Sequence, residues 1–273
     1  MYKNLLRIVS MDRKVLCISL IVALLVFTGC SQTATTTSRI AKVIVHEAKI
    51  DGSTGSMLGA QIGSWEVLDA NKAVRLSGLS IPLKVFQNAM QSNHLSNVVS
   101  FNLPDDVKKT TFVDHIDLQF SPTGFTQDMQ EPAFAFRIYS IPFSEEATIN
   151  CPDPETVTGA LIPTGYESVP SGSCIPQLGT RIAAQELQQD PDHPTPFARI
   201  NFGYSKGNMI FIEPVVTVAK FLQDESFTLY IPTPTMLIHN ILFPTTFTGV
   251  YEPDTNSYNL SIWEYEDLST PAS

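Results

Sequence analysis

The stretch that decides the fold is ARINFGYSKGNMIFIE, residues 198–213. Residues 198–204 and 209–213 are rich in the β-branched and aromatic side chains that favour strands. Between them stands Ser-Lys-Gly-Asn, residues 205–208, which has the composition of a tight turn. Two strand-like runs around such a turn predict an antiparallel β-hairpin.

Strand-like runs continue on both sides of this hairpin. In residues 133–138 large apolar side chains alternate with small or charged ones, which would place Phe134, Phe136 and Ile138 on one face of a strand. Other runs of this kind span residues 42–46, 65–67, 98–103, 115–120, 227–231 and 258–263.

Helical patterns are few. Residues 82–90, 182–188 and 215–222 are the candidates, and 19 prolines divide the chain into short pieces. Many short strands with few helices are typical of a β-sandwich or a barrel. The sequence therefore predicts a mainly β, single-domain fold, sandwich or barrel-like, with a few short helices.

Composition excludes several classes of protein. The chain has 273 residues, of which 43% are hydrophobic and 16% charged, so it can bury a large core and is not disordered throughout. Acidic residues outnumber basic ones by 27 to 17, which argues against broad contact with nucleic-acid phosphates. Five His and four Cys are few ligands for an enzyme that holds several metal ions.

The N-terminus has the pattern of an export signal. Four basic residues within positions 3–14 precede a mostly apolar run, residues 15–27, which is shorter than the roughly 20 residues of a membrane span. The sequence Phe27-Thr28-Gly29-Cys30 follows and resembles a bacterial lipobox, in which the Cys is lipidated and becomes the mature N-terminus. The alternatives are a plain signal peptide or an N-terminal anchor helix with an incidental Cys. Met11 is a second possible start.

These features predict the domain organisation and the location. We expect a lipoprotein signal peptide over residues 1–29, a flexible tether over 30–39, one β-rich domain over 40–266 and a disordered tail over 267–273. Lipid on Cys30 would hold the protein on the bacterial cell envelope. Because Ser31, not Asp, follows this Cys, the outer membrane is favoured if the cell has two membranes.

Export also determines how the remaining cysteines are interpreted. With Cys17 removed and Cys30 lipidated, Cys151 and Cys174 remain, and an isolated pair in an oxidising compartment is usually a disulfide. It would close a loop rich in Pro and Gly. A redox-active pair is the alternative, although such pairs usually stand two residues apart.

Familiar cofactor and metal motifs are absent. The sequence has no Walker loop, no Rossmann glycine fingerprint and no His-Glu-x-x-His. No His has a second His within five residues, which predicts isolated surface or turn histidines and neither a metal ion nor another cofactor. The histidines are His46, His94, His115, His193 and His239.

Several short motifs resemble, in serial order, a family of exported bacterial proteins of unknown function. They are LQFSPTGF at 118–125, PAFAFRIY at 132–139, PTGY at 163–166, PQLGTR at 176–181 and FIEPV at 211–215. The family is typified by a Thermus protein under an extracytoplasmic sigma-factor system, and the resemblance covers about residues 115–250. It implies a ligand site, because His and Asp residues at alternate positions of the family's central strand share one face.

This chain departs from the family pattern at the ligand positions. Phe125, Ala133, Ala135, Arg137 and Arg181 stand where the family has His or Asp, while Tyr166 and Glu213 persist. Ala and Phe offer no metal ligand, and Arg remains protonated. Three interpretations remain: a salt-bridged patch in place of a metal, a pocket in which two Arg bind a small anion, or residues that do not meet.

We expect a lipid-anchored envelope protein with a non-catalytic binding or structural role. Its partners would be the membrane, through the lipid, and a protein or a small anion, but no nucleic acid. The first alternative is an envelope hydrolase that draws an acid–base pair from carboxylates such as Asp114, Asp117 and Glu213. The second is a carbohydrate-binding module that stacks sugars on Trp65, Trp263 or Tyr265.

Overall fold

The computed structural model describes most of the chain beyond residue 39. The described residues are 40–47, 50–51, 62–91, 98–125, 129–151, 157, 159–166, 174–183, 188–190, 193–223, 226–237 and 241–268. The predicted signal peptide, the tether and Cys30 lie outside them. Within these residues, no helix is long and apolar enough to cross a membrane.

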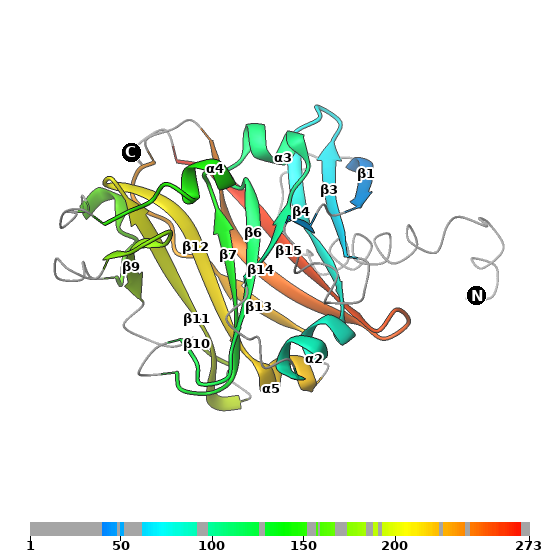
Figure 1. Ribbon diagram of the computed structural model, residues 1–273. Helices are drawn as coiled ribbons and strands as arrows, with labels where there is room; N and C mark the ends of the chain where they lie inside the picture. The colour runs from blue at the N-terminus through cyan, green and yellow to red at the C-terminus, as the bar shows by residue number, and fades with distance from the viewer. Residues whose placement is uncertain are drawn as a thin grey trace.

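Two antiparallel sheets make up the fold, as the sequence predicts (Figure 1). The six-stranded sheet has the order β1 (Ile40–Glu47), β3 (Gly63–Asp69), β4 (Val74–Pro82), β15 (Ser257–Asp267), β14 (Leu242–Glu252) and β13 (Phe227–Tyr230). The nine-stranded sheet has the order β2 (Ile50–Asp51), β5 (Val99–Asn102), β6 (His115–Ser121), β7 (Ala133–Tyr139), β12 (Asn208–Thr217), β11 (His193–Ser205), β9 (Gly179–Ala183) and β8 (Cys174–Ile175), with β10 (Gln188–Asp190) paired to β11.

The predicted hairpin is confirmed. Strands β11 and β12 pair antiparallel, and Ser205 faces Asn208 across the turn. Lys206 and Gly207 have φ angles of 50° and 77°. Positive φ at both central residues is the type I′ geometry, whose twist matches that of the flanking strands.

The main core lies between the two sheets, and aromatic rings fill one end of it. Helices α2 (Leu83–Gln91) and α5 (Val218–Leu222) lie together at the lower end of the molecule in Figure 1. Their buried Phe86 and Phe221 stack with ring centroids 4.6 Å apart. Phe134 of β7 meets both rings edge-on. Each helix thus closes the gap between the sheets with a Phe.

Of the three predicted helices, one is confirmed, one is confirmed in part and one is wrong. The helix expected over residues 82–90 is α2, which begins at Leu83, but Ile182 lies in strand β9, facing Phe202 of β11, so a helix over 182–188 is wrong. In the third candidate the helix begins only at Val218, because Val215 and Val216 continue β12 and pair with β7. Two short helices, α3 (Asp105–Thr110) and α4 (Phe143–Glu146), were not anticipated.

The face of the nine-stranded sheet that points away from the main core carries the candidate site. On β7, Phe134, Phe136 and Ile138 enter the core, as the alternation predicts. The intervening residues of β7 point to the other face, together with the odd-numbered residues of β6. Although this face is outside the core, its polar side chains are buried, among them His115, Asp117, Arg137, Asn201 and Glu213.

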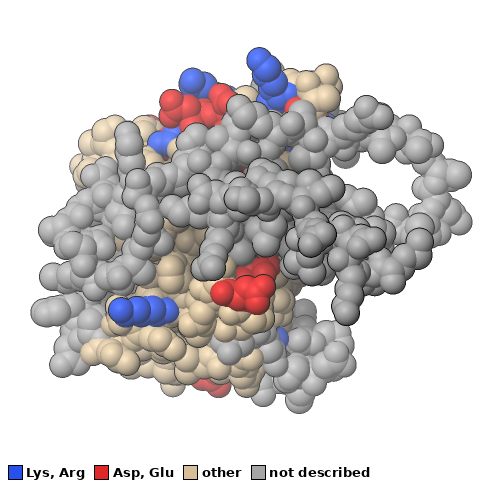
Figure 2. Space-filling view, turned by 90° about the vertical axis from the view of Figure 1, so that its right-hand side faces the viewer, with Lys and Arg blue, Asp and Glu red and all other residues tan. Residues whose placement is uncertain are grey.

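Charged side chains are mixed on the part of the surface that Figure 2 shows. Lys and Arg lie next to Asp and Glu at the upper edge of this view, and most of the other described surface there is uncharged. This distribution agrees with a chain in which only 16% of residues are charged.

Candidate functional site

Glu213 on β12 is the centre of a buried polar cluster that joins four strands, β7, β9, β11 and β12. Arg137 Nε on β7 donates to Glu213 Oε1 at 2.9 Å, and Asn201 Nδ2 on β11 donates to Oε2 at 2.7 Å. Arg181 Nη2 on β9 lies 2.5 Å from the same Oε2. The structure therefore brings Arg137, Arg181 and Glu213 together, which the sequence left open.

Two guanidinium groups keep Glu213 ionised. Burial by itself would raise the pKa of this carboxyl, but Arg181 and Arg137 outweigh it and lower the pKa below the ordinary value. Arg137 Nη2 also donates to Gln119 Oε1, so two of the three guanidinium nitrogens have partners within the protein. These contacts favour a salt-bridged patch over a pocket in which both Arg bind an external anion.

The other positions of the family pattern are divided between two places. Ala133 and Ala135 are buried beneath Phe125, whose carbonyl accepts a hydrogen bond from Arg181 Nη1 at 3.4 Å. Tyr166 is not part of this group. Its hydroxyl donates to the carbonyl of Ile200, and its ring packs edge-on against Phe202, which lies in the main core.

A second polar cluster surrounds His115, and the expectation of an isolated surface or turn histidine is wrong for this residue. The His115 side chain is fully buried at the start of β6. Its Nδ1 lies 3.1 Å from Asp114 Oδ1, and its Nε2 lies 3.3 Å from Glu146 Oε2 and 3.9 Å from Asp117 Oδ1. Asp114 and Asp117, two carboxylates that a hydrolase was expected to use, thus share one His, whereas Glu213 belongs to the arginine cluster.

Part of this cluster could have been found from the sequence. His115 and Asp117 stand two residues apart in a strand-like run, so they project to the same face. Glu146 could not be found in this way, because it comes from α4, a four-residue helix beyond the end of β7.

Burial and charge oppose each other in the pKa values of this cluster. Burial would lower the pKa of His115, but the carboxylates of Asp114 and Glu146 outweigh it and raise the pKa. Burial, with a smaller contribution from the nearby Glu146 carboxylate, raises the pKa of Asp117 to about 6. Burial also raises the pKa of Tyr139, whose ring stacks on His115. Perturbed groups of this kind gather at functional sites.

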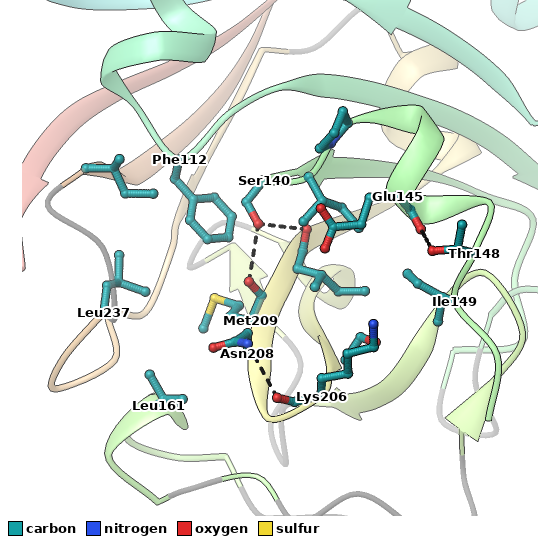
Figure 3. A pocket seen from close by; sticks show the side chains of 15 residues that line it. Phe112, Ser140, Glu145, Thr148, Ile149, Leu161, Lys206, Asn208, Met209 and Leu237 are labelled. Atoms are coloured by element: carbon teal, nitrogen blue, oxygen red, sulfur yellow. Dashed lines mark hydrogen bonds between the residues drawn. The ribbon is translucent and has the colours of Figure 1, made fainter. Parts of the chain in front are cut away.

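A cavity of about 270 Å³ borders α4 (Figure 3). In Figure 1, α4 lies at the end of the molecule opposite to α2 and α5. Phe112, Leu161, Met209 and Leu237 form its apolar wall. Ser140, Glu145, Thr148, Lys206 and Asn208 add polar groups on the other sides, and Ser140 Oγ is bound to the carbonyls of Met209 and Ile210.

One serine motif borders the cavity without forming a nucleophile site. Residues 203–207 spell Gly-x-Ser-x-Gly, the pattern of a nucleophile elbow. An elbow requires a strand followed by a helix, whereas these residues form the end of β11 and the hairpin turn into β12. No His of the described residues lines the cavity with Ser205.

The cysteine pair is compatible with the predicted disulfide. Cys151 and Cys174 are joined, with Cα atoms 5.7 Å apart, within the range of about 4.4–6.8 Å that disulfides require. The segment that this bond closes contributes Leu161 to the cavity wall. The carbonyl of Leu161 accepts a hydrogen bond from the Tyr204 hydroxyl at 2.8 Å.

The aromatic residues named for sugar stacking do not form an open platform. Trp65 is buried, with 1% of its surface exposed. Trp263 is half-buried on β15, and the hydroxyl of Tyr265 is hydrogen-bonded to Ser77 Oγ at 2.7 Å. Core packing, the commoner fate of such residues, accounts for Trp65.

Comparison of the chain with family models, curated proteins and solved structures gives no match, so the resemblance to the exported bacterial family remains a prediction.

Proposed function

We propose that this protein is a lipid-anchored component of the bacterial cell envelope whose β-domain binds a small, largely apolar ligand and catalyses no reaction. The observation that carries the binding role is the cavity of about 270 Å³ beside α4. Pockets for drug-sized ligands span roughly 300–1,000 Å³. The ligand is therefore smaller than these, with an apolar body and a polar group to meet Ser140, Glu145 or Lys206.

The anchoring role rests on the sequence. A basic segment, an apolar run over residues 15–27 and Cys30 in a lipobox-like context support export followed by lipidation. Acyl chains contribute about 0.8 kcal/mol for each buried CH₂, so several chains on one Cys hold a protein stably on a membrane. A formal net charge of −10 disfavours both anionic lipid surfaces and nucleic acid as direct partners.

Ligand binding can be tested with an apolar fluorescent probe such as N-phenyl-1-naphthylamine. We expect saturable binding to the wild-type protein and loss of binding in Leu237→Trp, because the added indole fills the cavity. The control is Leu222→Trp, since Leu222 lies outside the cavity lining and is 52% exposed. Circular dichroism would show that both variants are folded. An absence of saturable binding, or equal binding by Leu237→Trp, would contradict the proposal.

Lipidation can be tested by fractionation. Cys30→Ser should release the protein from the membrane fraction or leave its signal uncleaved, because the acyl acceptor is lost. Cys17→Ser, within the signal segment, is the matched control and should behave as wild type. Membrane association and cleavage that are both unchanged in Cys30→Ser would exclude the lipoprotein role.

An envelope hydrolase is the second candidate. It is favoured by one observation, the pairing of His115 with Asp117, whose pKa is raised to about 6. This pair could serve as acid and base near neutral pH. A hydrolase would cleave a reporter ester, phosphate or glycoside. Asp117→Asn would abolish the activity, while Glu266→Gln, an exposed residue outside the cavity and the His115 cluster, would not. Activity that survives Asp117→Asn would remove this candidate.

A further inference from the structure

Three side chains with metal-ligating atoms converge beside the end of the nine-stranded sheet. His115 and Asp117 project from the same face of β6, and Glu146, the last residue of α4, reaches them from beyond β7. Figure 1 shows α4 beside the upper ends of β6 and β7. One ligand atom from each of these residues lies within 4.8 Å of the other two.

Two of these atoms have no hydrogen-bond partner in the described residues. They are His115 Nε2 and Asp117 Oδ1, in side chains that are 0% and 3% exposed. The 3.3 Å contact between Nε2 and Glu146 is an ion pair without hydrogen-bond geometry. Buried polar groups almost always have partners, so an unpaired nitrogen and an unpaired carboxylate oxygen that face each other point to a bound species between them.

The arginine next to the site directs its hydrogen-bond donors at residues other than Asp117. Arg137 is its cross-strand neighbour on β7. However, Arg137 Nε donates to Glu213, and its Nη2 donates to Gln119. The Oδ1 of Asp117 is therefore left to face His115.

The histidine is held in the orientation that a metal requires. Asp114 Oδ1, 3.1 Å from Nδ1, favours the tautomer with its proton on Nδ1, which leaves the Nε2 lone pair directed at the site. Lys108 Nζ lies 4.0 Å from the same carboxylate. The imidazole is stacked between the rings of Tyr139 and Phe143, with centroid distances of 4.7 and 3.8 Å, so it cannot swing away.

We propose that His115, Asp117 and Glu146 bind a divalent transition-metal cation, with zinc as the expected ion and Asp114 as the residue that positions His115. Ligands about 2.0–2.2 Å from a tetrahedral zinc lie roughly 3.4 Å from one another. The distances of 3.3 and 3.9 Å from Nε2 to the two carboxylates are close to this value. One imidazole among two carboxylates suits zinc or manganese better than calcium, which takes six to eight oxygen ligands. The Glu146 side chain is 17% exposed and provides the entry.

The test is a metal titration of the full-length chain after treatment with a chelator. We expect one equivalent of Zn²⁺ to bind, measured by isothermal titration calorimetry, and the thermal unfolding temperature to rise, because the ion binds only the folded state. Co²⁺ in place of zinc should give the intense visible absorption of a tetrahedral site in the wild-type protein. This measurement uses only the wild-type protein, so its result does not depend on whether a variant folds.

Variants would locate the ion. Asp117→Asn and Glu146→Gln should each weaken zinc binding at least tenfold, and Asp114→Asn should weaken it roughly 10- to 100-fold by releasing His115. Glu145→Gln is the matched control, since Glu145 precedes Glu146 on α4 but is exposed and outside the cluster. Circular dichroism would confirm that each variant is folded.

Three outcomes would overturn the proposal. They are an absence of stoichiometric zinc binding and of a tetrahedral Co²⁺ spectrum, zinc affinity unchanged in both Asp117→Asn and Glu146→Gln, and equal binding of Mg²⁺ or Ca²⁺. None of them bears on the apolar ligand proposed for the cavity, whose wall contains neither His115, Asp117 nor Glu146.

Discussion

At the scale of single residues, Glu213 shows which partners a buried carboxylate takes in a chain that has Arg137 and Arg181 at ligand positions of the family pattern. The carboxylate is fully buried, and its oxygens are divided between Arg137 on one side and Arg181 and Asn201 on the other. A buried ion pair gives little net stability relative to apolar packing, but the loss of one partner leaves a buried charge without compensation. Removal of Glu213 should therefore cost more free energy of unfolding than the ion pair contributes, because it leaves a buried arginine charge unpaired.

The first prediction follows from this arrangement. Glu213→Ala should lower the free energy of unfolding by roughly 3–5 kcal/mol, because it leaves Arg137 buried without its counter-ion. Glu266→Ala is the control, since it removes the same charge from an exposed position and should change stability by less than about 0.5 kcal/mol. Urea denaturation of both variants measures the difference. Equal stability of Glu213→Ala and wild type would show that the arginines are not held by this residue.

The second prediction concerns pH. The pKa of Glu213 is lower in the folded protein than its ordinary value of 4.5. Folding therefore favours the ionised form, and the stabilisation is complete above about pH 4.5 and is lost as the pH falls through the lowered folded-state pKa. The stability difference between wild type and Glu213→Gln should be constant at neutral pH and should shrink below pH 4.5. A difference that grows on acidification would contradict this sign.

At the scale of elements, short helices complete the core where the strands end. The helix α5 has only five residues, too few for stability by itself, so it depends on the contacts of its buried face. Phe221 provides that face and touches Phe86, Phe134, Phe227 and Tyr258. The next residue, Leu222, is 52% exposed.

This pair of neighbours gives the third prediction. Phe221→Ala should destabilise the protein by about 3–5 kcal/mol, because it leaves a cavity among packed rings. Leu222→Ala, on the exposed side of the same helix, should cost less than about 0.5 kcal/mol. Thermal or urea unfolding distinguishes them, and similar losses in the two variants would contradict the burial of Phe221.

At the scale of the whole molecule, a disulfide connects the segment between α4 and β8 to the rest of the protein. The bond joins Cys151 to Cys174 across a separation of 23 residues. That segment supplies Leu161 to the wall of the cavity. The disulfide is therefore expected to affect both the stability of the protein and ligand binding in the cavity.

The fourth prediction tests this link. A peptide map of the exported protein without reductant should recover the peptides of Cys151 and Cys174 joined. Replacement of both residues by Ser should reduce stability by about 3 kcal/mol, because the unfolded chain is no longer restrained. The single variant Cys17→Ser should have no such effect on the mature protein. Two free thiols in exported protein would contradict the disulfide.

Much of the fold was predictable because its information is local. Alternation in residues 133–138 identified strand β7 and its core face. The turn-like composition of residues 205–208 identified the hairpin, and its Gly207 accepts positive φ without strain. The helix predicted over 182–188 failed because pairing with β11 and burial of Ile182 outweigh a weak local preference. The cysteine pairing was predictable because only Cys151 and Cys174 remain once Cys17 is assigned to the signal and Cys30 to the lipid. The mainly β class was predictable from the number of short strands.

What the sequence by itself determined is therefore the strand pattern, the main turn and the face on which each β7 side chain lies. The tertiary structure alone decided that Glu213 meets two arginines from different strands, and that Glu146 of α4 reaches His115 and Asp117. Glu213 meets arginines that stand 32 and 76 positions away, and Glu146 meets His115 and Asp117 from 31 and 29 positions away, so both clusters are assembled by strand order and helix placement. Periodicity reports only a residue's own neighbours along the chain, so it assigns side chains to a face but cannot show which strands will lie side by side.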